Sequence, residues 1–140
     1  MIDRRLVVIG CGAAKLDERA PAAELYTGQH FRACLLTARA LVPDERIRIL
    51  SARHGLVGLA DELDPYDVRM GQAGSITADE LARQVVELDE LNSQVLALCG
   101  AAYVAVLRRV FGVVLTPLAG LGIGRQRHEL AVMRARAASS

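Results

Sequence analysis

Four short apolar segments constrain the fold of this chain most, because each of them ends in a turn that carries glycine or polar residues. The segments cover residues 6–9, 47–50, 95–98 and 113–115. Helical stretches of about ten residues or more separate them, and this alternation is typical of a parallel sheet covered by helices. We therefore predict the α/β class, as one three-layer domain over residues 1–140. Its open, mainly parallel sheet has four strands, with helices on both faces.

Hydrophobic spacing predicts the helices between these strands. Phe31, Leu35 and Ala38 recur at intervals of three and four, which indicates one face of an amphipathic helix over residues 29–41. Thr77 and Glu80 have the spacing of a capping box, so a helix is expected from there to residue 91. Two further helices are expected over residues 101–111 and 124–137. The stretch 52–75 lacks regular periodicity, and we expect it to be a mobile binding loop.

Composition and charge exclude several classes of protein. A net charge of +1 gives no overall positive field of the kind that grips nucleic acid through many phosphates. The three cysteines lack close spacing and no secretory leader is recognisable, so a reducing cytoplasm is expected. No apolar run approaches the roughly 20 residues that span a bilayer, so no membrane partner is expected. The oligomeric state is left open.

The turns after the four strands hold most residues with chemical potential. Strands of a parallel sheet point their carboxyl ends the same way, and ligands usually bind in the crevice that the following loops form. The turns at 11–15, 51–55, 99–103 and 120–125 are therefore expected to meet in one site. No ligand spacing for a metal is present among the cysteines and histidines, and the sequence indicates no cofactor.

The first two turns supply an amine, a thiol and an imidazole. Lys15 follows small residues that suit close approach of a ligand, and Gly12 lies in the same turn. Cys11 has two readings, as a thiolate nucleophile or as a small buried filler. His54 is equally compatible with proton transfer and with a purely structural hydrogen bond. Ser51 is a weaker candidate, because no nucleophile elbow surrounds it.

The remaining candidates are two tyrosines, a carboxylate and a glycine-rich turn. Tyr26 and Tyr66 can each stack on a planar base or fill the core, and Asp67 can activate water or hold a sugar hydroxyl. Gly122 and Gly124 alternate with apolar residues ahead of Arg125, so their N–H groups and the guanidinium are predicted to hold an anion. A structural role for the basic residues near the C-terminus, as complements of a helix dipole, is the alternative.

Several segments together resemble a known family. These are the segments 8–15, 25–31, 50–56, 65–67 and 117–124, and they are similar to a bacterial and phage family of unknown function that is sometimes labelled as similar to the YaaA peroxide-stress proteins. More distantly, Cys11 with Lys15 and the Ser-Ala-Arg-His-Gly-Leu-Val segment resemble a domain of archaeosine synthase. The sheet and the Asp-Pro-Tyr at 64–66 are similar to the uracil-DNA glycosylase fold. This resemblance implies a pocket for a nucleobase or nucleotide.

These observations lead to one main functional hypothesis and two rivals. We expect an enzyme that binds a nucleobase, nucleoside or nucleotide, free or within DNA or RNA, and that acts at a glycosidic bond or on the base. His54, Asp67 and Lys15 are the predicted catalytic residues. The predicted substrate-binding residues are Cys11, Gly12, Tyr26, Ser51, Tyr66, Gly122, Gly124 and Arg125. The rivals are a non-catalytic nucleic-acid-binding module for stress protection and a thiol-dependent protein that uses Cys11.

Overall fold

The computed structural model describes residues 4–139 and confirms the predicted α/β class. In this part of the chain one sheet has five strands in the order β4-β3-β1-β6-β7. The strands β1 (Arg5–Gly10), β3 (Ile47–Ser51), β6 (Gln94–Leu98) and β7 (Val113–Leu115) are parallel to one another and match the four predicted strands. The strand β4 (Gly55–Gly58) pairs antiparallel with β3. All the predicted strands are therefore present, with one addition at the edge.

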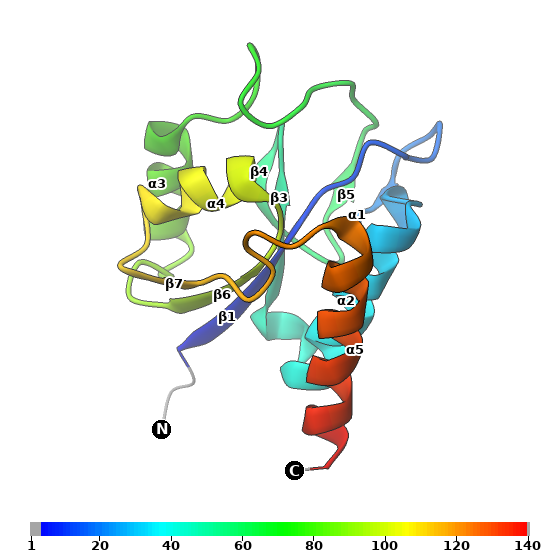
Figure 1. Ribbon diagram of the computed structural model, residues 1–140. Coiled ribbons are helices and arrows are strands. Elements are labelled where there is room, and N and C mark those ends of the chain that lie inside the picture. The colour runs from blue at the N-terminus through cyan, green and yellow to red at the C-terminus, as the bar shows by residue number, and fades with distance from the viewer. Residues whose placement is uncertain (1–3, 140) are drawn as a thin grey trace.

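Helices cover both faces of this sheet (Figure 1). The helices α2 (Gln29–Leu41) and α5 (Ile123–Ala138) pack side by side on one face. The helices α3 (Ala78–Glu87) and α4 (Ala101–Arg108) lie on the other. The alternation of β1 explains this layering, because Val7 and Ile9 join the core under α2 while Leu6 and Val8 join the core under α3 and α4.

Short elements complete the chain. The helix α1 (Ala22–Leu25) and the 3₁₀ turn η1 (Asp44–Arg46) flank α2 in the sequence. A second, two-stranded sheet joins β2 (Ala20–Pro21) to β5 (Glu62–Leu63) in antiparallel register. None of the helices within residues 4–139 is both long and apolar enough to cross a membrane.

The capping box was predicted correctly, but the end of its helix was not. The Thr77 side chain accepts a hydrogen bond from the Glu80 N–H, and the Glu80 carboxylate accepts one from the Thr77 N–H. The helix α3 ends at Glu87, four residues before the predicted boundary. Asp89 has a φ of 56°, a left-handed conformation that an α-helix cannot contain. The helix α4 likewise ends at Arg108 and not at residue 111.

The interpretation of residues 52–75 as irregular throughout was wrong, because β4 and β5 lie within it. The strand β4 follows β3 after a three-residue turn, with Ser51 opposite Gly55. Gly55 has a φ of +78°, and a Cβ there would collide with Gln84 Oε1 and Ile76 Cδ1. The Gln84 amide occupies this space because it accepts a hydrogen bond from the Leu56 N–H and donates one to the His54 carbonyl. Only glycine therefore fits this turn.

Gly55→Ala is expected to lower the free energy of unfolding by about 2–4 kcal/mol, since it adds both left-handed strain and overpacking. Urea denaturation followed by circular dichroism measures the loss. Gly58→Ala is the matched control, because a Cβ there would lie 3.5 Å from Asp61 Oδ2, which is ordinary van der Waals contact. Equal stability of the two variants would contradict this account of the turn.

Candidate functional site

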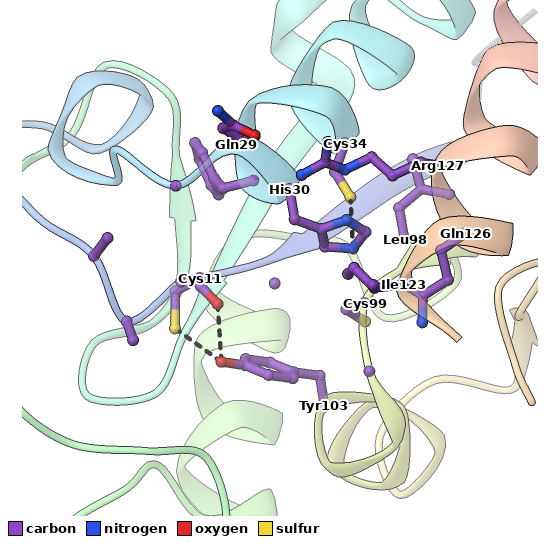
Figure 2. Close-up of a pocket in the computed structure, with 17 residues that line it drawn as sticks. Cys11, Gln29, His30, Cys34, Leu98, Cys99, Tyr103, Ile123, Gln126 and Arg127 are labelled. Carbon is purple, nitrogen blue, oxygen red and sulfur yellow. Dashed lines mark hydrogen bonds between the residues drawn. The ribbon is translucent and has the colours of Figure 1, made fainter. Parts of the chain in front are cut away.

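Two adjoining cavities lie at the carboxyl ends of β1 and β6, lined between them by the turns after these strands and by the first turn of α5, whereas the predicted turn at 51–55 lines neither. The larger has a volume of about 420 Å³ and the smaller about 310 Å³. Both are lined by Cys11, Gly12, Ala13 and Tyr103, so the turn after β1 and the start of α4 form their common wall. Figure 2 shows the larger cavity, with Cys11 and Tyr103 hydrogen-bonded beside it.

The smaller cavity brings together two of the three predicted catalytic residues. Lys15 and Asp67 line it together with Arg69, although they lie far apart in the sequence. Asp67 is exposed and Lys15 is half-buried. The Lys15 ammonium lies 4.4 Å from the centre of the Tyr66 ring and 5.8 Å from that of Tyr26, and it donates a hydrogen bond to the Ala13 carbonyl. These cation–π contacts hold the amine at the cavity wall.

Tyr66 lies at the centre of a cluster of buried hydroxyl groups. Its hydroxyl is 2.5 Å from that of Tyr26 and accepts a hydrogen bond of 2.8 Å from Ser51 Oγ. Burial raises the pKa of Tyr66 above its ordinary range, and the neighbouring Cys11 thiol raises it further. Burial also raises the pKa of Tyr26. Both phenols are therefore protonated at neutral pH.

Tyr26 and Ser51 are fully buried, so they support the site from beneath and present no surface to a ligand. Ser51 Oγ accepts a hydrogen bond from the His54 N–H, which ties the β3–β4 turn to the cluster. The His54 ring packs edge-on against Tyr66 at 5.3 Å, and its Nε2 is buried without a hydrogen-bond partner. His54 thus lies next to Tyr66 but does not line either of the two cavities.

Cys11 is fixed at the boundary of the cavities by hydrogen bonds on all sides. Its N–H donates to the Leu50 carbonyl, and its Sγ accepts from the Ala52 N–H at 3.4 Å. The Tyr103 hydroxyl donates to the Cys11 carbonyl at 3.0 Å and lies 3.1 Å from Sγ. Burial raises the pKa of Tyr103 above its usual range, and the hydrogen bond with Cys11 raises it further, so this hydroxyl keeps its proton.

The larger cavity is lined by residues that the sequence analysis did not place in the site. His30 from α2 and Gln126 with Arg127 from α5 face it (Figure 2). Gly122 caps α5, but neither Gly122, Gly124 nor the exposed Arg125 lines either cavity. Gln126 and Arg127 follow the glycine-rich turn directly, and this was the available signal. The orientation of the helix decides which of its side chains face the cavity.

Three helices begin at the larger cavity without a side-chain cap. The N-cap residues of α2, α4 and α5 are Gly28, Gly100 and Gly122, and none forms a side-chain hydrogen bond to the first turn. Gly28 and Gly100 line the cavity themselves, as does Ile123 at the first position of α5. The first N–H groups of a helix have no partner within it and carry partial positive charge. The cavity therefore lies at the positive ends of three helices.

All three cysteines line the larger cavity, and burial makes two of their thiols less acidic. Burial raises the pKa of the Cys34 thiol to about 11 and that of Cys99 to about 12. Both thiols are therefore protonated at neutral pH. Among the described residues, no group of three or more His, Cys, Asp or Glu side chains is arranged to hold a metal ion.

Iodoacetamide at pH 8 is expected to alkylate Cys34 and Cys99 at least about tenfold more slowly than free cysteine under the same conditions. Only about one thousandth of Cys34 and less of Cys99 is thiolate at that pH, and the thiolate is the reactive form. Mass spectrometry of peptides over a time course measures the three rates. Labelling of either Cys34 or Cys99 at the rate of free cysteine would contradict the effect of burial on these two thiols.

Comparisons with known proteins give one family. A search of curated proteins found no match. The model of a family of unknown function, DUF6884, matches residues 6–132, which include every strand of the large sheet from Leu6 onward. The likeness to YaaA proteins and the more distant likenesses to archaeosine synthase and uracil-DNA glycosylases stay predictions. Since the match covers most of the chain, the protein belongs to the DUF6884 family of unknown function.

Proposed function

We propose that this protein is an enzyme that binds a nucleobase, nucleoside or nucleotide and acts at its glycosidic bond or on the base. The observation that carries the proposal is the pairing of an amine and a carboxylate, Lys15 and Asp67, on the wall of one cavity. Transfer or hydrolysis at a glycosidic bond requires a negative group for the developing oxocarbenium ion and a proton donor for the departing base. Asp67 and Lys15 have these two chemistries.

The identity of the cation supports a role in proton transfer. The chain contains 17 basic residues, and Lys15 is its only lysine. An arginine stays charged at every accessible pH, whereas a lysine amine can give up its proton and take it back. All the other basic residues of the chain are arginines, and the one lysine lies at the position where this proposal needs proton exchange.

The contacts of Lys15 suit that role. Its ammonium has a ring face at 4.4 Å and one carbonyl acceptor, and it forms no ion pair in the part of the chain that the structure describes. A cation held by a ring face and not by a carboxylate keeps N–H groups available for a ligand. In this proposal Lys15 protonates the leaving base, and Asp67 stabilises the positive charge on the sugar.

His54 acts in this proposal through Tyr66. Its ring packs against the edge of Tyr66, and the face of Tyr66 receives Lys15. The Tyr66 hydroxyl is held by Ser51 and Tyr26, so the ring is fixed in position and orientation. Direct proton transfer by His54, as predicted from the sequence, requires Nε2 to become accessible when the ligand binds.

Lys15→Ala and Asp67→Asn are each expected to lower the rate of base release by about 100-fold or more, the usual contribution of a positioned acid or charge-stabilising group. The assay incubates the protein with nucleosides, 5′-nucleotides and short oligonucleotides and measures free base by chromatography. Because both side chains lie at the wall of an open cavity, the melting temperature should change little. Asp17→Asn is the control, since Asp17 is exposed and lines neither cavity.

Unchanged turnover in both variants would remove the proposed pair. If no base-containing small molecule binds and duplex DNA binds with an affinity that collapses between low and moderate salt, the rival nucleic-acid-binding module is the better description. A thermal-shift screen with the same compounds separates these cases first, because a ligand that binds only the folded state raises its melting temperature.

A further inference from the structure

A cavity without a carboxylate adjoins the proposed catalytic pair. The larger cavity is lined by residues from the β1 turn, the starts of α2 and α4, and the first turns of α5, and no Asp or Glu of the described chain is among them. Arg127 contributes a full positive charge, and within residues 4–139 it forms no ion pair or hydrogen bond. The smaller cavity differs from the larger one in holding a carboxylate, that of Asp67, beside Lys15 and Arg69.

His30 supplies a buried hydrogen-bonding group without a partner. Its Nε2 lies 3.7 Å from Cys34 Sγ, and its Nδ1 is buried and unpartnered. Burial lowers the pKa of His30, and the charge of Arg127 lowers it further, so the imidazole is neutral at pH 7. In the tautomer in which the Cys34 thiol donates to Nε2, the ring carries its own proton on Nδ1. In that tautomer the Nδ1–H donor lies at the cavity near Arg127 and the side chain of Gln126.

A buried donor without an acceptor costs free energy, so its presence beside an unpaired arginine indicates a missing anionic acceptor. The positive N-terminal ends of α2, α4 and α5 also favour an anion in this cavity. A guanidinium binds phosphate oxygens with two parallel hydrogen bonds, which makes arginine well suited to this group.

The two cavities are placed so that one ligand can span them. They share Cys11, Gly12, Ala13 and Tyr103, and none of the shared residues except Tyr103 has a long side chain that could divide them. Volumes of about 420 and 310 Å³ lie within the range for small-molecule sites. A ligand with an anion at one end and a sugar and base at the other matches this division.

We propose that the larger cavity binds the phosphate group of the substrate through Arg127 and His30, so that the substrate class is a nucleoside 5′-phosphate and not a free nucleoside or base. This inference rests on the proposed function for the nature of the rest of the ligand. The phosphate site itself does not depend on the reaction. It also places the anion at Arg127, two residues beyond the Arg125 predicted from the sequence.

The test measures binding to the whole chain by isothermal titration calorimetry in a phosphate-free buffer at constant ionic strength. The probes are inorganic phosphate, the common nucleoside 5′-monophosphates and the matching nucleosides. The proteins are the unaltered chain, Arg127→Gln, Arg125→Gln and the control Arg32→Gln. Arg32 is an exposed arginine of α2 that lines neither cavity, so its replacement makes the same change in net charge.

Arg127→Gln is expected to weaken binding of phosphate and of the monophosphates by about tenfold or more, the loss of a charge-assisted pair. Arg32→Gln should leave both affinities within about twofold. The monophosphates should also bind at least about tenfold tighter than their nucleosides. Circular dichroism confirms that each variant is folded.

Three results overturn the inference. The first is equal affinity of phosphate for the unaltered chain and for Arg127→Gln. The second is equal affinity of the chain for nucleosides and for their monophosphates. The third is that Arg125→Gln loses phosphate binding while Arg127→Gln keeps it. If nucleosides bind and the Lys15 and Asp67 variants lose turnover while Arg127→Gln behaves normally, the proposed function stands and this inference fails. If phosphate binds through Arg127 but no nucleoside moiety adds affinity, the phosphate site stands and the proposed function fails.

Discussion

The end of strand β1 fixes the geometry on which the rest of the site depends. β1 is the central strand, with β3 on one side and β6 on the other. Beyond its last residue, the Cys11 N–H still bonds to Leu50 of β3, while the Cys11 carbonyl accepts from Tyr103 of α4. Gly10 allows the close approach of β6, because a Cβ there would lie 3.0 Å from Cys99 Cβ. The turn after β1 is therefore fixed by contacts with β3 on one side and with α4 on the other. Because this turn lines both cavities, its position fixes theirs.

The sequence predicted the strands well because their signal is local. Each parallel strand is an apolar run between turn residues, and such a run can be recognised without knowing which elements pack on it. The strand β4 was missed because it has only four residues, two of which are glycine. Its turn is held by Gln84 of α3, which bonds both to the turn and to the strand. A contact across 28 residues leaves no periodic trace in the sequence.

The site was predicted in part, and the errors have a common cause. Lys15, Tyr66, Ser51 and His54 were identified from their position after strands, and the structure brings them into contact around the Tyr66 ring. Arg127 and His30 were missed because they lie on helices. Successive helical residues point about 100° apart, so Arg125 and Arg127 face different directions, and the packing of α5 on α2 selects between them. Sequence position alone does not contain that choice.

The two cavities differ in the charges that line them, and this difference suits them to different roles. In the smaller cavity a carboxylate and two cations share one wall, an arrangement that can stabilise either sign of charge as a bond breaks. In the larger one the field has a single sign, and it is set by groups fixed in the backbone and by Arg127. A fixed field of one sign binds an anion equally before and after reaction, so it anchors without promoting chemistry. The mixed wall can respond to charge that appears only in the transition state. In the proposed function, the larger cavity holds the ligand and the smaller one reacts with it.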